Sequence, residues 1–90
     1  MNATRIRRRV IVHGQVQGVF FRDTVRRKAR ETGVAGWVKN RPDGTVEAVF
    51  EGPPPAVEEM IALASEGPPQ ARVDRVECLD EPVEGLGNFK

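Results

Sequence analysis

The chain has 90 residues, of which 39% are hydrophobic and 30% are charged, a composition typical of a soluble globular protein. This length predicts a single domain over residues 1–90, and no apolar run approaches the roughly 20 residues needed to cross a bilayer. The basic start of the chain does not resemble a signal peptide, and the lone cysteine, Cys78, excludes an internal disulfide. A cytoplasmic location is therefore expected.

Hydrophobic periodicity and the placement of glycine and proline predict four strands and two helices. In chain order they are a strand at 5–13, a helix at 21–32, strands at 34–40 and 45–51, a helix at 56–66 and a strand at 72–80. Gly33 is a typical stop after the first helix, and Asp43-Gly44 is typical of a hairpin turn. The order βαββαβ predicts an α+β, ferredoxin-like sandwich, in which an antiparallel sheet carries two helices on one face.

The most informative stretch is GQVQGVFFR at residues 14–22, between the first strand and the first helix. Gly14 and Gly18 allow the backbone to turn several N–H groups toward one point, and the start of a helix adds further unpaired donors. Arg22 supplies a cation with a planar fork of donors. These features describe a cradle for a small tetrahedral anion such as phosphate. A plain structural turn explains the glycines equally well, because neither the Walker A nor the dinucleotide-binding spacing is present.

The inventory of reactive side chains limits the chemistry of such a site. The only histidine, His13, ends a predicted strand, and the only serine, Ser65, falls late in a predicted helix, so a Ser-His-Asp arrangement is not expected. Histidine and cysteine together are too few for a zinc site, and no pair of carboxylates adjoins the loop. We therefore expect no metal and no cofactor, and a catalysis that depends on positioning and electrostatics.

Two blocks of the sequence resemble the acylphosphatase family. The first is GQVQGVFFR at 14–22, and the second is GWVKN at 36–40, which leads into DGTVE at 43–47. Both occur at the spacing of that family, and the resemblance covers about residues 6–80. The chain is thus identified as similar to a small stand-alone acylphosphatase, a family with the ferredoxin-like fold. Family members usually end with a further strand, which here is reduced to a stub around Phe89.

The resemblance implies hydrolysis of the carboxyl–phosphate bond of acyl phosphates to carboxylate and inorganic phosphate. It matches Arg22 to the arginine that binds the phosphoryl group, and Asn40 to the asparagine that holds the attacking water. The loop residues expected to bind phosphate through their backbone N–H groups are Gln15, Val16, Gln17, Gly18 and Val19. A free phosphate or sulfate ion is expected to occupy the same site. We expect a monomer with no nucleic-acid or membrane partner.

Two other functions compete with this interpretation. A ferredoxin-like domain can bind RNA through aromatic residues on its central strands, although here only Trp37 and Phe50 are candidates and the RNP1 string is absent. The basic first half of the chain would suit such a partner, or it would attract an anionic substrate. For Arg26, Arg27, Lys28 and Arg30 we expect only a solvated helix face. Acylphosphatase-like domains also occur in larger carbamoyl-transfer maturation proteins. A chain of 90 residues without zinc-finger cysteines argues against that alternative.

Several other side chains have expected places. We expect Phe21 to begin the buried stripe of the first helix and Phe20 to line the mouth of the site. His13 is expected to be a hydrogen-bonded strand residue, Trp37 a core or sheet-face residue, and Cys78 a core or half-buried small hydrophobe. The buried stripe of the second helix is expected to consist of Val57, Ile61 and Ala64.

Overall fold

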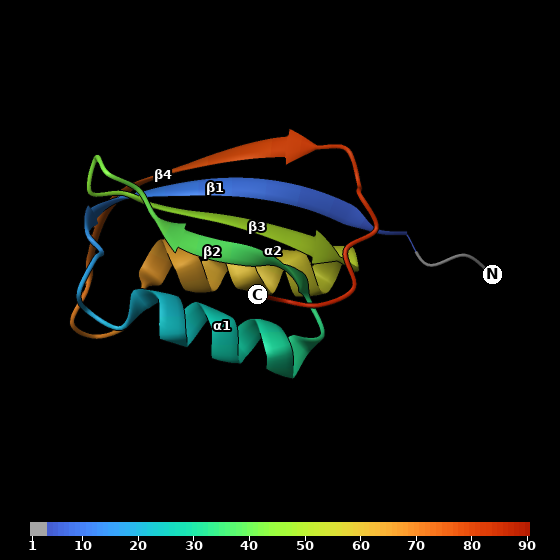
Figure 1. The fold of residues 1–90 in the computed structure, drawn as a ribbon, viewed down its shortest axis with the longest axis horizontal. Helices are drawn as coiled ribbons and strands as arrows, with labels where there is room; N and C mark the ends of the chain where they lie inside the picture. Colours follow the sequence, from blue (N-terminus) through green and yellow to red (C-terminus); the bar gives the residue numbers. More distant parts are fainter. Residues whose placement is uncertain (1–3) are drawn as a thin grey trace.

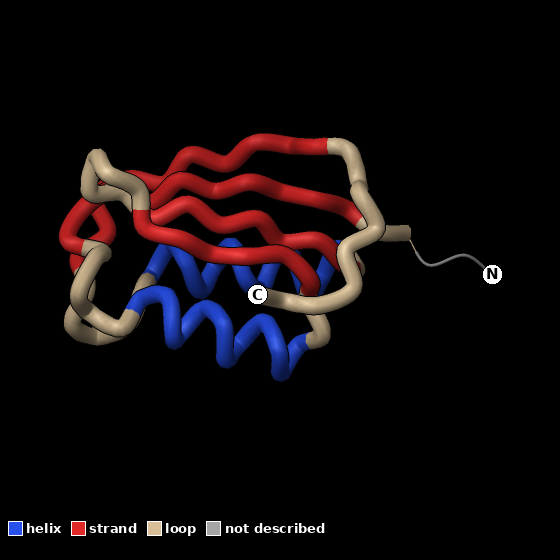
Figure 2. Tube along the Cα trace, viewed as in Figure 1, coloured by secondary structure: helices blue, strands red, loops and turns tan. Residues whose placement is uncertain are grey.

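The computed structural model, which describes residues 4–90, consists of a four-stranded antiparallel sheet with two helices (Figure 1). The elements are β1 (Ile6–Gln15), α1 (Phe21–Thr32), β2 (Ala35–Asn40), β3 (Val46–Gly52), α2 (Pro54–Glu66) and β4 (Arg72–Glu81). The strand order is β2-β3-β1-β4, and both helices lie on the same face of the sheet (Figure 2). The predicted α+β, ferredoxin-like architecture is confirmed.

The predicted element boundaries agree with the structure to within two residues. The largest differences are at the end of β1 and at the start of α2. β1 continues past His13 because a bulge between His13 and Gly14 shifts the register, and β4 then pairs with two further residues of β1. α2 begins at Pro54 because a proline in the first turn of a helix sacrifices no intrahelical hydrogen bond. None of the helices in residues 4–90 is long and apolar enough to span a membrane.

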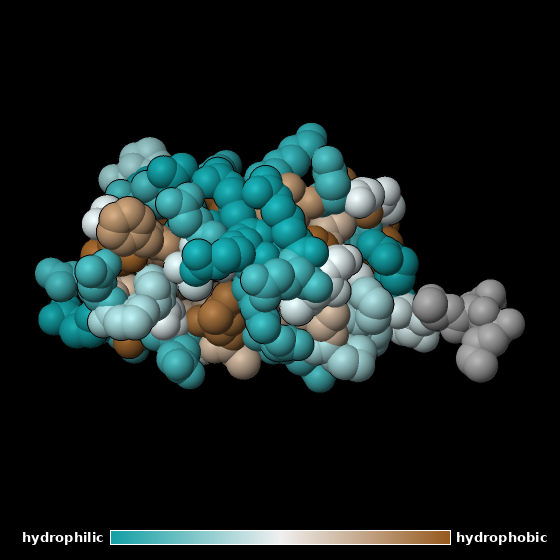
Figure 3. Space-filling model, turned by 90° about the horizontal axis from the view of Figure 1, so that it is seen from below, coloured by the Kyte–Doolittle hydropathy of each residue, from teal (hydrophilic) through white to brown (hydrophobic). Residues whose placement is uncertain are grey.

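The hydrophobic core lies between the sheet and the helices. Its largest fully buried hydrophobic side chains are Phe50 and Met60, and burial of a side chain of this size contributes about 1.5–3 kcal/mol. The prediction for α2 was wrong at one position, because Met60 is fully buried whereas Ile61 is only partly buried at the margin of the core. Seen from the helix side, the surface of the molecule is mainly hydrophilic, with scattered hydrophobic areas (Figure 3).

The C-terminal segment packs against β2, the edge strand at that side of the sheet. Phe89 is 5% exposed, and its ring stacks on Phe50 with 6.0 Å between the ring centroids. The backbone N–H of Gly36 donates to Asn88 O at 3.0 Å, and the N–H of Lys90 donates to Gly36 O at 2.9 Å. These bonds form an isolated parallel bridge between Gly36 and Phe89. The predicted stub therefore exists and protects this edge of the sheet.

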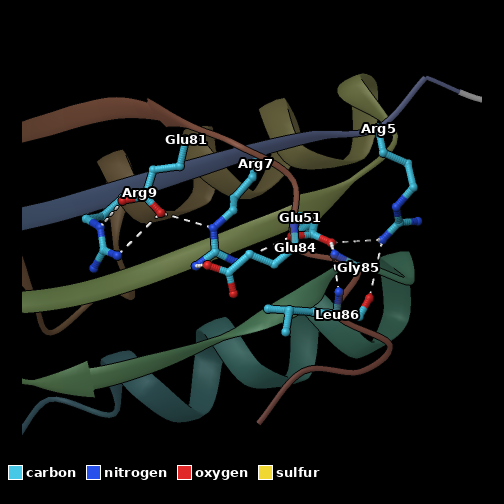
Figure 4. Close-up of polar contacts among 8 residues, drawn as sticks. All are labelled: Arg5, Arg7, Arg9, Glu51, Glu81, Glu84, Gly85 and Leu86. Carbon is cyan, nitrogen blue, oxygen red and sulfur yellow. Dashed lines mark hydrogen bonds and ion pairs between the residues drawn. The ribbon is translucent and has the colours of Figure 1, made fainter.

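Glu51, near the end of β3, carries a fully buried carboxylate that anchors the segment after β4 (Figure 4). Its oxygens accept the backbone N–H groups of Glu84, Gly85 and Leu86 at 3.0, 2.7 and 2.8 Å. The buried guanidinium of Arg7 donates a fourth hydrogen bond at 3.3 Å. Burial raises the pKa of Glu51, but the three N–H donors and Arg7 outweigh it and hold the pKa below its usual value.

Arg7 and Arg9 extend this network across the outward face of the sheet. Arg7 donates to Glu81 at 3.0 Å, and Arg9 donates to Glu81 and to Glu47. The hydrogen bond from Arg9 contributes most to holding the pKa of Glu81 below its usual value. The N-terminal part of β1, the C-terminal end of β4 and the segment that follows β4 are therefore held together by ionised groups.

We expect Glu51→Gln to lower the free energy of unfolding at neutral pH by about 2–4 kcal/mol, because an amide cannot replace a buried carboxylate that accepts four hydrogen bonds. Urea unfolding followed by circular dichroism measures the loss. The matched control is Glu84→Gln, since the Glu84 side chain is 62% exposed and only pairs with Arg7 at 3.5 Å. This control should lie within about 0.5 kcal/mol of wild type.

The same carboxylate makes stability depend on pH in a defined direction. The folded-state pKa of Glu51 lies below its unfolded value, so its stabilising contribution is complete above the unfolded pKa of about 4.3. The contribution disappears as the pH falls through the folded-state pKa. Wild type should therefore lose stability between pH 4.5 and strong acid more steeply than Glu51→Gln does. Parallel curves for the two proteins would contradict an ionised Glu51.

Candidate active site

A cavity of about 230 Å³ opens at the end of the molecule where the β1–α1 loop, the first turn of α1 and the end of β2 meet. In Figure 1 these three segments lie together at the left of the view. The cavity is lined by Val16, Gly18, Phe20, Phe21, Arg22, Asp23 and Asn40. The structure thus brings both predicted catalytic residues, Arg22 and Asn40, into one space together with part of the predicted loop.

The β1–α1 loop presents backbone N–H groups that have no acceptor in the protein. Within residues 4–90, the N–H groups of residues 16–19 donate to no backbone or side-chain acceptor. Gly18 has φ 73°, a left-handed conformation that turns the loop toward α1 at no steric cost for glycine. The first helical backbone bond of α1 is Thr24 N to Phe20 O at 3.1 Å, so the first-turn amides also remain available. Unpaired donors in this arrangement are typical of an anion site.

Not every predicted loop residue takes the same part in this arrangement. Val16 and Gly18 line the cavity directly. Gln17 and Val19 belong to the same run of unpaired N–H groups, although they are absent from the lining of this cavity in the described structure. Gln15 is the last residue of β1 and pairs with Arg72 of β4. The run of unpaired N–H groups therefore covers residues 16–19, and Gln15 lies at its margin.

Arg22 lies in the first turn of α1, with its side chain exposed. In the part of the chain that the structure describes, Arg22 has no carboxylate within ion-pair distance, whereas Arg26 pairs with Asp23 at 3.8 Å. A cation beside the positive end of a helix dipole is unfavourable by about 0.3–1 kcal/mol. An anion bound between the loop and Arg22 would offset this unfavourable interaction of Arg22 with the helix dipole.

Asn40 is the last residue of β2, and the turn that follows it is closed by Asp43. The carboxylate oxygen Oδ1 of Asp43 accepts the hydroxyl of Thr45 at 2.6 Å and the N–H of Thr45 at 3.0 Å. These two hydrogen bonds hold the pKa of Asp43 below its usual value. Arg41 N donates to Thr45 O at 2.9 Å and completes the predicted hairpin turn. The exposed side chain of Asn40 is therefore carried by a well-defined strand end.

Gln17 connects the loop to this turn through its side chain. Its Nε2 donates to Arg41 O and to Thr45 O, both at 2.8 Å. The amide thus uses both of its donors on the turn that follows Asn40. The prediction assigned Gln17 only a backbone contribution and missed this contact, because its partners lie 24 and 28 residues away in the sequence. No local pattern indicates which polar side chain of a loop will reach such partners.

Phe20 lines the cavity as predicted, and its backbone conformation is unusual. Its φ of 62° and ψ of 22° place it in the left-handed region, where it is the one non-glycine residue among residues 4–90. Such a conformation costs a bulky residue roughly 1–3 kcal/mol. The side chain is 67% exposed, whereas the next residue, Phe21, is 2% exposed and begins the buried stripe of α1 as predicted.

The remaining predicted residues lie outside the cavity. His13 is a hydrogen-bonded strand residue as expected, because its Nε2 lies 2.6 Å from Glu77, and this bond lowers the pKa of Glu77. The prediction for Cys78 was wrong, since it is exposed. Cys78 pairs with the buried Val10 of β1, but β4 is an edge strand, and of its side chains only Val73 and Val76 pack against the core.

The two aromatic residues considered for RNA stacking are both engaged within the protein. Phe50 is fully buried in the core. Trp37 lies half-buried on the outward sheet face, where its ring centroid is 5.5 Å from the guanidinium of Arg9 and 5.1 Å from the ammonium of Lys39. Phe50 therefore cannot stack on a base, and the ring of Trp37 is already in contact with two cationic side chains. Over residues 4–90, no group of three or more His, Cys, Asp or Glu side chains is placed to hold a metal ion.

Comparison with known proteins agrees with this site. The acylphosphatase family model matches residues 8–90. The chain is 56% identical to the acylphosphatase of Thermococcus kodakarensis over 86 residues, which cover 96% of this chain and 94% of that protein. Its structure is similar to that of an acylphosphatase from Coxiella burnetii, with a TM-score of 0.89, 42% identity, and coverage of 94% of this chain and 90% of that one.

The fold also resembles one part of a much longer protein. Full-length HypF, solved in a phosphate- and nucleotide-bound form, matches with a TM-score of 0.90 and 27% identity over 99% of this chain but only 12% of HypF. The identity to the two acylphosphatases is higher, and this chain covers most of the length of each. This chain therefore belongs to the acylphosphatase family, and it is an enzyme that hydrolyses acyl phosphates.

Proposed function

We propose that the enzyme holds the phosphoryl group of its substrate in the cradle of loop 16–19 and Arg22, while Asn40 orients the water that attacks phosphorus. The observation that carries this proposal is that one cavity of about 230 Å³ brings together unpaired loop amides, an unpaired guanidinium and a side-chain amide from a different strand. One chain supplies all of these groups, so the enzyme acts in this proposal as a monomer.

The cradle acts on the charge of the phosphoryl group. Backbone N–H donors and the N-terminus of α1 face the phosphoryl oxygens, and Arg22 adds a charge-assisted contact with a planar donor fork. Because these donors are already in place before the substrate arrives, they stabilise the transition state without reorganisation. Phosphoryl transfer requires mainly this kind of positioning and charge stabilisation. Inorganic phosphate or sulfate should bind in the same place.

Asn40 acts on the water. The water oxygen forms a bond to phosphorus, the bond between phosphorus and the carboxyl oxygen breaks, and the carboxylate leaves with the electron pair. The water proton passes to a phosphoryl oxygen, so no side-chain base is needed. A carboxylate is a good leaving group, which also removes the need for a general acid. Asn40 contributes by holding the water in line with the leaving oxygen.

The direct test is hydrolysis of benzoyl phosphate by the purified protein, followed by its ultraviolet absorbance, with and without EDTA. We expect turnover that the chelator leaves unchanged, and competitive inhibition by inorganic phosphate. Loss of turnover on chelation, with recovery on adding a divalent cation, would contradict the proposed mechanism. Purely non-competitive inhibition by phosphate would contradict the cradle as the substrate site.

The side chain of Gln17 should matter for turnover more than for phosphate binding. The Gln17 side chain links the cradle to the turn after Asn40. In Gln17→Leu, Asn40 and its water should therefore be held less precisely relative to the phosphoryl group, and kcat should fall about tenfold or more. The inhibition constant of phosphate should stay within about twofold. The matched control is Gln70→Leu, an exposed glutamine in the turn before β4 that does not line the cavity, and unchanged kcat is expected for it. A Gln17→Leu enzyme with full kcat would remove this link from the mechanism.

A further inference from the structure

We propose that Phe20 forms a subsite for the acyl group, so that the enzyme favours acyl phosphates whose acyl part is aromatic. The proposal rests on the proposed function, because it takes the cradle as the place of the phosphoryl group. The ring of Phe20 lines the same cavity as Arg22 and Asn40. Phe21 also lines this cavity but is 2% exposed, so Phe20, at 67%, supplies the accessible aromatic surface there.

Two unfavourable features coincide at Phe20. It is the most exposed of the large hydrophobic side chains in residues 4–90, at 67%, compared with 49% for Leu79 and 45% for Val83. It also has the left-handed backbone conformation described above. Strained backbone in a folded protein persists only where the surroundings hold it, and it is concentrated at functional sites. An aromatic acyl group over the ring would remove exposed apolar surface from water.

The surroundings of Phe20 keep its ring at the rim of the cavity. Its carbonyl oxygen accepts the N–H of Thr24 at 3.1 Å and the hydroxyl of Thr24 at 2.9 Å, which ties its backbone to the start of α1. The buried Phe21 fixes the rotation of this helix against the core. Phe20 therefore cannot exchange places with Phe21, and its side chain remains available at the mouth.

The size and composition of the cavity suit a substrate of this class. A cavity of about 230 Å³ has room for more than a phosphoryl group and one water. Its apolar lining comes from Val16, Phe20 and Phe21, beside the polar Arg22, Asp23 and Asn40. In an acyl phosphate a single oxygen joins phosphorus to the acyl carbon, so the acyl group lies directly beside the cradle. Aromatic groups prefer offset or edge-to-face contact with a ring at such a rim.

The test compares kcat/KM for benzoyl phosphate with kcat/KM for acetyl phosphate in wild type, Phe20→Asn and Phe20→Tyr. Asparagine tolerates the left-handed backbone, so Phe20→Asn should fold and melt at or above the temperature of wild type. We expect the ratio of benzoyl to acetyl kcat/KM to fall about three- to tenfold in Phe20→Asn and to stay within about twofold in Phe20→Tyr. The inhibition constant of inorganic phosphate should stay within about twofold of the wild-type value in both variants.

A matched control removes an exposed hydrophobic side chain elsewhere. Leu79→Thr on β4 should leave the benzoyl-to-acetyl ratio unchanged. Phenylphosphonate should also inhibit wild type more strongly than methylphosphonate does, and Phe20→Asn should reduce this preference by the same factor. An unchanged ratio in Phe20→Asn, or an equal loss for both substrates, would overturn the acyl subsite while leaving the proposed function intact. Absence of hydrolysis of either substrate by wild type would overturn the proposed function, and this inference with it.

Discussion

Arg22→Ala should weaken both phosphate binding and turnover. A charge-assisted contact of a guanidinium with the phosphoryl oxygens is worth on the order of 1.5–3 kcal/mol in binding, or roughly 10- to 150-fold in the inhibition constant of phosphate. More is lost at the transition state, where charge on the phosphoryl oxygens is stabilised by preorganised donors, so kcat/KM should fall by about 10³ or more. Steady-state kinetics with phosphate as inhibitor measures both quantities.

Two further variants separate the specific contact of Arg22 from general positive charge. Arg22→Lys keeps the charge but loses the planar fork, so it should restore little of the lost activity. Arg27→Ala removes one positive charge from an exposed position on the same helix, and it should change kcat/KM by no more than about twofold. Normal phosphate affinity in Arg22→Ala would remove Arg22 from the cradle. An equal loss of kcat/KM in Arg27→Ala would indicate that the general positive charge of α1, and not a specific contact of Arg22, supports activity.

Asn40→Ala should show a different kinetic pattern. Asn40 is proposed to contact the water and not the phosphoryl group, so its removal should lower kcat by about 10²–10³. The inhibition constant of phosphate should stay within about twofold, because the cradle remains intact. This split between turnover and binding is the feature that distinguishes Asn40 from Arg22. Both constants come from the same benzoyl phosphate assay.

The neighbouring Lys39 provides the control for Asn40. Its side chain is 61% exposed and pairs with Glu47 at 3.7 Å. Lys39 does not line the cavity, so Lys39→Ala alters the same strand end and leaves the cavity lining unchanged. It should leave kcat and phosphate affinity within about twofold of wild type. Circular dichroism and melting curves of Asn40→Ala must match those of wild type for the comparison to hold. An Asn40→Ala enzyme with full kcat would exclude Asn40 from positioning the water.

The sequence by itself determined the order of the elements and the local part of the site. Both follow from interactions between residues that are close in the chain. Alternating and helical hydrophobic patterns report which face of a short segment is buried, and glycines mark the turns, so the boundaries agree with the structure to within two residues. The proposed cradle is also local, because one loop and the first turn of one helix supply Gly18 and Arg22.

Only the tertiary structure decided how distant segments meet. Gln17 reaches carbonyl groups 24 and 28 residues away, and Glu51 accepts N–H groups 33 to 35 residues later, which no periodic pattern encodes. The same holds for burial at the limits of the core: Met60 replaces its neighbour Ile61 in the buried stripe, and Cys78 is exposed on an edge strand. Periodicity indicates the face of an element, whereas the packing of the other elements determines how far that face is covered.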